Sequence, residues 1–331
     1  MATTAHISTD PDAPSAPTGR RIGVMLPRDL PPHEVLQFAR QADSLGFDEL
    51  WVIEDLGFRG GVAQAAAVLA ATSRITVGIG ITPAAVRHAA FAAMEIATLG
   101  QLFPGRIVAG LGHGMPAWMR SLGLWPASPL TLLEETATAV RSVLRGEAVP
   151  QGRYVTLEHE EFTELPDVVP PVLLGVRGPR SLALSGRIAD GTLLAEPAPP
   201  TYIRAARSHI SATGPHQLIT YDVAAVSKDS GLALEAVRPG LAYIGEPDWA
   251  PHLVGLDFAD DLAALRARCE SPQEFARQLP LTWVDALSLA GTPEGIRAKI
   301  AARHDAGATS VVLTPVGENR LYQLEQLAQV Q

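Results

Sequence analysis

A histidine set between glycines is the residue of this sequence best placed to do chemistry. His113 follows the apolar run IVAGLG (107–112), and Gly112 and Gly114 flank it. The run has the length and composition of a buried strand, so the ring is expected at the carboxyl end of a strand, beside residues too small to obstruct a ligand. The imidazole could move a proton near neutral pH, or it could serve the structure alone, and the sequence leaves both interpretations open.

Two adjacent acids form the second candidate. Glu54 and Asp55 follow the apolar run LWVI (50–53). Successive residues of a strand face opposite sides, so only one of the two carboxylates can point toward a site at the end of this strand. That acid could act as a general acid or base, or orient a ligand. The structural alternative is that one of them caps a helix or forms an ion pair with Arg59.

The turn GVRGPRSL (175–182) is the third candidate, because its composition suits an anion. Pro179 is expected at the first position of a helix, where its missing N–H has no partner to lose. The backbone amides that follow are then free at the positive end of the helix dipole, and Arg177 and Arg180 add charge. A phosphate-binding turn and a tight turn with solvated arginines fit this spacing equally well.

Apolar runs alternate with helical segments along the chain, and Gly or Ser stands near most junctions. The pattern predicts strands at 22–26, 50–53, 75–81, 107–112, 171–176, 188–194, 219–226 and 308–314. It predicts helices at 33–45, 60–72, 88–102, 129–146, 179–187, 200–212, 231–242 and 293–304. Eight such units close most simply into a (β/α)8 TIM barrel of the α/β class. A doubly wound open sheet is the alternative, but the first strand is followed by PRDLPP, which lacks the glycine-rich turn of such folds.

Two segments exceed a minimal barrel. We expect an insertion after the fourth strand, residues 113–170, with a helix and a short YVTL strand (154–157). A second insertion follows the seventh strand, at residues 243–290. Insertions after barrel strands cover the carboxyl-terminal mouth, where substrate pockets form. Residues 1–19 are expected to be a flexible leader, and residues 20–331 a single barrel domain.

Composition limits the partners and the compartment. The net charge of −9 argues against a nucleic-acid or anionic-membrane partner, because no basic stripe is present to bind phosphates. No apolar run is long enough to span a bilayer. The single cysteine, Cys269, fits a reducing cytoplasm. The nine histidines lack metal-ligand spacing, so no metal site is expected.

Several segments together resemble the bacterial luciferase-like flavin and deazaflavin oxidoreductases. They are LGFDELWVIEDLGFRGG, TSRITVGIGITPAAVRHAAFAAMEIATLGQLFPGRIVAGLGHG, PPVLLGVRGPRSLALSGRIADGTLL and GTPEGIRAKIAARHDAGATSVVLTP. The resemblance covers about residues 20–315 in the right order. It implies a (β/α)8 barrel, often a homodimer, that binds FMN or coenzyme F420, a 5-deazaflavin, at the mouth. The combination of WVIED, FRGG, AME and GHGMPAWM is similar to the deazaflavin-dependent subgroup.

The resemblance also assigns roles to residues. It implies a non-prolyl cis peptide near Gly80–Ile81, against which the ring packs, and contacts to the ring from Gly112, His113 and Gly114. The cofactor phosphate would be held by Gly175, Val176, Arg177, Gly178, Pro179 and Arg180. Three segments depart from the family pattern. Glu54-Asp55 stands where sugar-phosphate and alcohol oxidisers often carry Asp-His, and Met115 stands where they carry an acid. The usual R-x-P after the third strand is replaced by Arg87-His88-Ala89.

The sequence therefore predicts an F420-dependent oxidoreductase. We expect hydride transfer between the deazaflavin and a small organic substrate with an activated C=C or C=N bond, or the reverse oxidation. Glu54 or Asp55, together with His113, would be the proton donors. One alternative is an FMN-dependent monooxygenase that uses reduced flavin and dioxygen. Another is a non-catalytic barrel that only binds a flavin.

Overall fold

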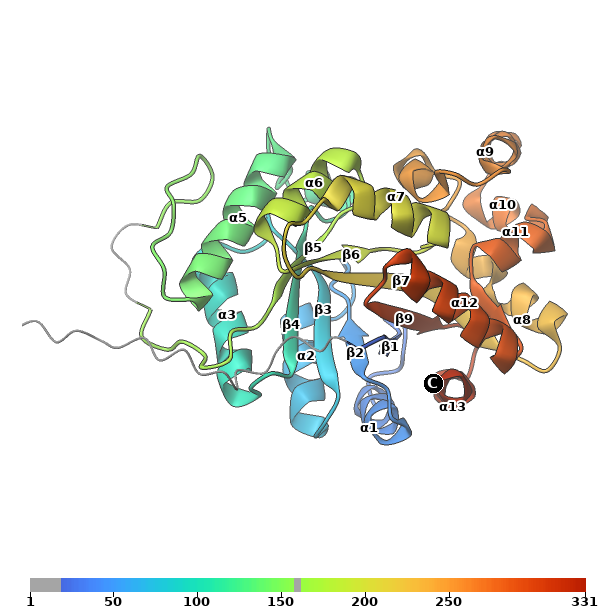
Figure 1. Ribbon diagram of the computed structural model, residues 1–331, viewed down its shortest axis with the longest axis horizontal. Coiled ribbons are helices and arrows are strands. Elements are labelled where there is room, and N and C mark those ends of the chain that lie inside the picture. The colour runs from blue at the N-terminus through green and yellow to red at the C-terminus, as the bar shows by residue number, and fades with distance from the viewer. Residues whose placement is uncertain (1–18, 158–161) are drawn as a thin grey trace, which may run out of the picture.

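The computed structural model describes residues 19–157 and 162–331, and these form a closed barrel surrounded by helices (Figure 1). Its strands are β1 (Arg21–Met25), β2 (Glu49–Val52), β3 (Thr76–Pro83), β4 (Ile107–Gly112), β5 (Val172–Gly175), β6 (Gly191–Leu194), β7 (Gln217–Val226), β8 (Leu289–Gly291) and β9 (Ser310–Pro315). Eight of them pair in parallel in the order β1–β2–β3–β4–β5–β6–β7–β9, and β9 pairs with β1 to close the ring. The short β8 pairs only with the end of β7. The predicted (β/α)8 TIM barrel is confirmed.

Helices occupy the outside of the barrel (Figure 1). They are α1 (Val35–Leu45), α2 (Gly61–Ala71), α3 (Ala89–Leu102), α4 (Pro116–Ser121), α5 (Pro129–Leu144), α6 (Pro179–Ile188), α7 (Pro200–Ile210), α8 (Ser230–Val237), α9 (Ala259–Arg268), α10 (Pro272–Gln278), α11 (Leu281–Ala286), α12 (Pro293–Ala306) and α13 (Arg320–Leu327), with 3-10 turns η1 (Arg238–Leu241), η2 (Pro247–Leu253) and η3 (Ala328–Val330). Glycine caps turn two of them toward the next strand: Gly46 (φ 99°) after α1 and Gly307 (φ 118°) after α12 lie in the left-handed region. Over residues 19–157 and 162–331, none of the helices combines the length and apolar character needed to cross a bilayer.

Two apolar layers hold the barrel together. The larger one lies between the strands and the outer helices and includes Phe38, Leu69 and Ile107. The smaller one fills the inside of the barrel, with Trp51 and Tyr221 in edge-to-face contact at 5.7 Å between ring centroids. Side chains from strands all round the ring close the interior below the mouth: Met25, Trp51, Val108, Leu173, Leu193, Ile219, Tyr221 and Val312.

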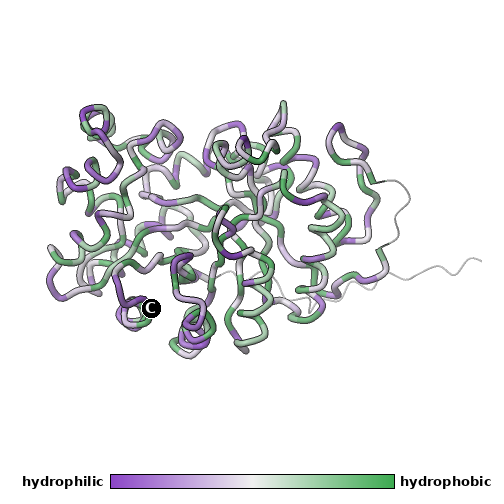
Figure 2. The backbone as a smooth tube through the Cα atoms, turned by 180° about the vertical axis from the view of Figure 1, so that it is seen from behind, coloured by the Kyte–Doolittle hydropathy of each residue, from purple (hydrophilic) through white to green (hydrophobic). Residues whose placement is uncertain are grey.

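Helices α2 and α3 differ from an ordinary outer helix, because both are apolar nearly all round (Figure 2). α2 carries no charged residue, and α3 carries only Glu95. Phe91, Met94 and Leu102 of α3 are 65%, 49% and 66% exposed. A helix that is apolar on all sides is usually covered on all sides.

The first insertion contains α4 and α5, but the predicted YVTL strand (154–157) is wrong. Among the described residues, these four have no strand partner. The amides of Arg153, Tyr154 and Val155 instead donate to the carboxylate of Glu135 on α5, at 2.9, 2.6 and 3.0 Å. A side chain therefore satisfies the backbone groups that a neighbouring strand would have paired.

The second insertion is mainly helical. It holds η2, α9, α10, α11 and β8, and its apolar cluster also includes Val223 and Ala225 of β7. Phe258 and Trp283 stack within this segment at 5.1 Å. In Figure 1, α9, α10 and α11 lie together at one end of the molecule.

One strand and one helix also differ from the predicted elements. The strand predicted at 188–194 begins only at Gly191, because α6 continues to Ile188. The C-terminal helix α13 was not predicted. The predicted leader, residues 1–19, lies outside the described residues except for Gly19, so this prediction and the single-domain boundary at residue 20 stay predictions.

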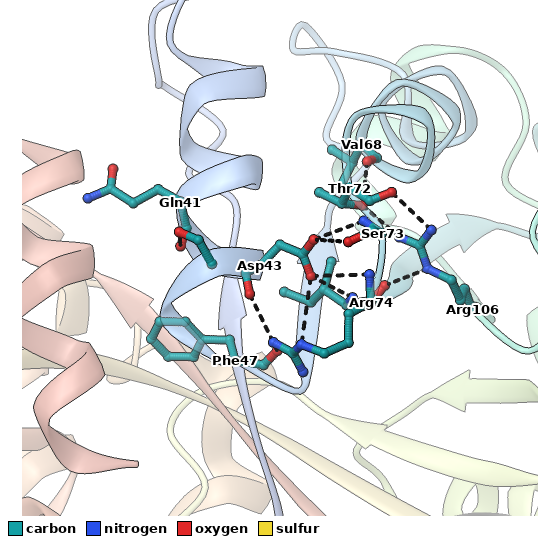
Figure 3. A network of polar contacts seen from close by, with 10 residues as sticks. Gln41, Asp43, Phe47, Val68, Thr72, Ser73, Arg74 and Arg106 are labelled. Atoms are coloured by element: carbon teal, nitrogen blue, oxygen red, sulfur yellow. Dashed lines mark hydrogen bonds and ion pairs between the residues drawn. The ribbon is translucent and has the colours of Figure 1, made fainter.

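The end of the barrel opposite the mouth is held by the carboxylate of Asp43, at the end of α1 (Figure 3). It accepts hydrogen bonds from the amides of Ser73 (2.8 Å), Ile75 (2.8 Å) and Arg74 (3.3 Å), just before β3. Arg106, just before β4, donates to the carbonyls of Ile75 and Thr72. These contacts fix the entry of two adjacent strands.

Replacing this carboxylate is expected to destabilise the fold in a pH-dependent way. Burial raises the pKa of Asp43, but the hydrogen bonds from Ser73, Ile75 and Arg74 outweigh burial, so the pKa lies below its usual 3.8. Asp43→Asn should cost about 1–3 kcal/mol near pH 7. Because the folded-state pKa is depressed, that cost should shrink as the pH falls below the unfolded-state value of about 4. Urea unfolding at pH 7 and pH 3.5 checks this, and an equal cost at both would contradict it.

Candidate active site

The predicted site residues lie at one end of the barrel, because all its strands run parallel. Glu54 follows β2, His113 follows β4, and Arg177 follows β5. In barrels of this kind the carboxyl ends of the strands carry the active site. The structure therefore brings the three predicted groups to the same mouth.

The two adjacent acids point to different partners, as strand alternation requires. Glu54 accepts two hydrogen bonds from Arg87, at 2.6 and 3.0 Å, and one from the amide of Gly61 at the start of α2 (2.7 Å). Asp55 forms an ion pair with Arg28, which follows β1, at 2.5 Å. Arg59 binds neither acid and donates instead to the carbonyls of nearby residues. Glu54 thus joins β2 to the loop after β3.

Removing the charge of Glu54 is expected to cost stability. Its side chain is 14% exposed and that of Arg87 is 23% exposed, so the pair is only partly screened by solvent. Glu54→Gln should lower the free energy of unfolding by about 1–3 kcal/mol. Thermal unfolding measures the change, and Glu134→Gln, which removes an exposed pair with Arg187, is the control. Equal effects of the two substitutions would contradict the account.

The predicted cis peptide is present between Gly80 and Ile81 in β3. The side chain of Ile81 lies over the glycines of the neighbouring strands. A Cβ on Gly175 would come within 2.4 Å of Ile81 Cγ2, and one on Gly112 within 3.0 Å of Ile81 Cγ1. These glycines therefore make room for Ile81, which gives the mouth an apolar platform.

His113 contacts the turn that begins α6. Its Nε2 lies 3.5 Å from Ser181 Oγ. Burial lowers the pKa of His113, and Arg177 lowers it further, while a hydrogen bond to the backbone of Pro129 opposes them. The ring is therefore expected to be neutral at pH 7 and to act as a hydrogen-bonding group. Gly114 beside it has φ 69°, a conformation that glycine adopts without strain.

The start of α6 has the geometry expected of an anion site. Pro179 is the first helical residue, and no side chain of the described part of the chain caps the helix at Gly178. Arg177 lies over the Trp249 ring at 4.7 Å and donates to the carbonyl oxygen of Asp248 at 3.1 Å, so it is held in place by the second insertion. Arg180 is exposed.

Sequence reasoning missed two residues at the mouth, Glu196 and Tyr221. Glu196 stands two positions beyond the end of β6, and Glu54 and Arg177 hold the same place after β2 and β5. That spacing was the available signal. Tyr221 lies within β7, where it cannot be told from a core residue. Its buried hydroxyl has no hydrogen-bond partner among the described residues.

The chain matches the family described as luciferase-like monooxygenase over residues 3–310. The 5,10-methylenetetrahydromethanopterin reductase of Methanolobus tindarius is 28% identical over 309 residues, which cover 89% of this chain and 94% of that protein. The F420-dependent glucose-6-phosphate dehydrogenase of Microbacterium testaceum is 34% identical over 173 residues, 48% of this chain and 52% of that protein.

Solved structures agree on the fold. The coenzyme F420 dependent tetrahydromethanopterin reductase from Methanopyrus kandleri superposes with a TM-score of 0.81 at 24% identity, covering 94% of this chain and 98% of that one. The FMN complex of the oxygenating constituent of 3,6-diketocamphane monooxygenase from Pseudomonas putida gives a TM-score of 0.66 at 17% identity, over 94% and 97% of the two chains. The family match spans nearly the whole sequence, and it confirms the resemblance of the motifs. The chain belongs to the luciferase-like monooxygenase family.

Proposed function

We propose that this protein is a coenzyme F420-dependent oxidoreductase that acts on a small organic substrate. The observation that carries the proposal is the pairing of an apolar platform with an anion site at one mouth. Ile81 provides the platform between Gly112 and Gly175, and α6 begins beside it without a side-chain cap. A flat ring with a phosphate tail fits this pairing. The relatives named F420-dependent support the same choice.

The residues at the mouth fit such a cofactor. Gly80, Ile81, Gly112, His113 and Gly114 would contact the ring. The phosphate would be held by the turn of Gly175, Val176, Arg177, Gly178, Pro179 and Arg180. When bound, the reduced cofactor supplies a hydride for the reduction of a C=C or C=N bond, and the oxidised form accepts one in the reverse direction.

The chain's own side chains would orient the ligands and handle protons. His113, held near Ser181, would donate or accept a hydrogen bond at the ring edge. Asp55 would face the substrate, paired with Arg28. Glu54 was predicted as a proton donor, and its contacts with Arg87 and Gly61 favour a positioning role. The catalytic roles of these three residues stay predictions.

Cofactor titration tests the proposal. Coenzyme F420 should bind, read as a change in its fluorescence, and more tightly than FMN. Arg180→Ala should weaken binding about twofold to fivefold, because it removes one exposed charge near the phosphate. Arg204→Ala on α7 is the matched control and should leave the affinity unchanged. Tight binding of FMN alone would favour the flavin monooxygenase instead, and binding without any turnover would favour the non-catalytic barrel.

We also propose a homodimer that uses the exposed face of α3. Phe91, Met94 and Leu102 follow one side of this helix at helical spacing, next to the apolar α2. An apolar patch of this kind marks an interface, and a second copy would cover it with the same patch. Phe91→Glu with Met94→Glu should convert dimer to monomer in sedimentation, while Tyr322→Glu, an exposed aromatic on α13, should not.

The buried single cysteine, Cys269, agrees with the cytoplasm as the proposed compartment.

A further inference from the structure

The segment after β6 carries an acid, Glu196, whose backbone is fixed from the second insertion. Trp249 Nε1 donates to the Glu196 carbonyl oxygen at 3.1 Å. The next carbonyl, of Pro197, lies 3.0 Å from Nδ1 of the buried His252. Both contacts are made by main-chain carbonyl oxygens. They fix the backbone at Glu196 and leave its carboxyl group free of these two hydrogen bonds.

Strand register places this acid among the charged groups of the mouth. β6 runs between β5 and β7, with Leu193 opposite Gly175 and Leu194 opposite Thr220. The chain just beyond β6 therefore lies beside Arg177 on one side and beside the β7 residues Tyr221 and Asp222 on the other. Glu196 is half-buried as a residue, and it lies two positions beyond the mouth end of β6.

Glu196 differs from the two acids that the sequence singled out. Glu54 and Asp55 are each held by an arginine at 2.6 and 2.5 Å. Within residues 19–157 and 162–331, Glu196 forms no ion pair at such a distance, and Arg177 is turned toward Trp249. A neighbouring arginine favours the ionised form of a carboxyl group. Of the three acids, Glu196 is therefore the one best able to hold a proton.

The surroundings of Glu196 favour the protonated form. Burial raises the pKa of its carboxyl group. Its own amide and Arg177 lower the pKa, whereas Asp222 and Asp55 raise it, and the net direction is upward. Tyr221, on β7, is the remaining titratable group nearby, and burial raises its pKa so that it stays neutral. An acid at the mouth whose pKa is raised can serve as a general acid.

We propose that Glu196 is the catalytic acid of this mouth and gives its proton to the substrate atom that gains electrons. This inference rests on the proposed function. In the reduction of a C=N bond, a hydride supplied by the bound cofactor would form the new C–H bond while the π electron pair moves to nitrogen. The O–H bond of Glu196 breaks, an N–H bond forms, and the resulting carboxylate regains a proton from water.

Carbon-13 NMR of protein labelled at the glutamate carboxyl carbons tests whether Glu196 holds the proton. One signal should titrate at higher pH than the others, and it should be absent from Glu196→Gln. Glu235→Gln, on the surface of α8, is the control and should leave that signal in place. The Gln variant should fold normally, because the backbone contacts to Trp249 and His252 remain. If all glutamates titrate together, the proposal is overturned.

Kinetics separate this proposal from the proposed function. Coenzyme F420 should bind wild type and Glu196→Gln alike, and failure to bind wild type would sink the proposed function while the NMR titration still decides on Glu196. With reduced F420 and pyrroline or cyclohexenone as probe, Glu196→Gln should lower kcat about a hundredfold or more. Glu196→Asp should recover part of the rate. A Gln variant that keeps the wild-type rate and pH profile would overturn the assignment.

Discussion

Asp222→Ala is expected to destabilise the protein by about 3–5 kcal/mol, because it leaves a buried guanidinium without its counter-charge. Arg303 of α12 donates to both carboxylate oxygens of Asp222, at 2.8 and 3.0 Å. The two side chains are 3% and 0% exposed. The same carboxylate accepts the amide of Ala198, at 3.1 Å, so the variant also leaves a buried N–H unpaired. Urea unfolding followed by circular dichroism measures the loss.

An exposed ion pair on the same helix provides the control. Lys299 and Asp285 approach to 2.7 Å, and the Asp285 side chain is 55% exposed. Asp285→Ala should cost less than about 1 kcal/mol, because solvent screens such pairs. If Asp222→Ala costs no more than this control, burial of the Arg303 pair is not what stabilises the junction of β7 and α12.

Gly80→Ala is expected to disturb the centre of the mouth. A Cβ at this position would come within 1.9 Å of Tyr221 Oη and 3.1 Å of Tyr221 Cζ, inside a packed barrel. Overpacking of this kind costs about 1–3 kcal/mol, and it should also displace Ile81 and weaken cofactor binding. Thermal unfolding and F420 titration measure the two effects.

A second substitution identifies the cause. Tyr221→Phe removes the colliding oxygen, which has no partner among the described residues, so alone it should change stability little. Added to Gly80→Ala, it should restore most of the lost stability. Gly60→Ala is the control, because a Cβ at that position would have no other atom within 4 Å. If the double variant is as unstable as Gly80→Ala alone, the collision with Tyr221 is not the reason that position 80 holds glycine.

The regular part of the fold was predictable because its elements follow local patterns. Residues 75–81, 88–102 and 107–112 alternate between short apolar runs and a helical segment, and they form β3, α3 and β4 within a few residues of the predicted bounds. The YVTL segment was misjudged because its partner, Glu135, comes from an earlier helix. Sequence pattern carries no record of such a long-range contact.

The site was predictable only where glycine, proline or a strand end marks it. The turn at 175–180 has such marks, whereas the Gly80–Ile81 cis peptide was expected only from the family resemblance. The ion-pair partners of Glu54 and Asp55 have no mark of this kind in the sequence. Arg87 and Arg28 come from other loops and meet the two acids only after the barrel closes. The sequence signal for Glu196 is its position two residues after an apolar run. That signal becomes specific only when the neighbouring strands are known.

The second insertion is connected to the mouth of the barrel at two places. Its apolar cluster includes Val223 and Ala225 of β7, so its helices pack directly on a barrel strand. Trp249 also contacts Arg177 and the backbone of Glu196. Substitutions within the insertion are therefore expected to shift these two residues at the mouth, although neither of them belongs to the insertion.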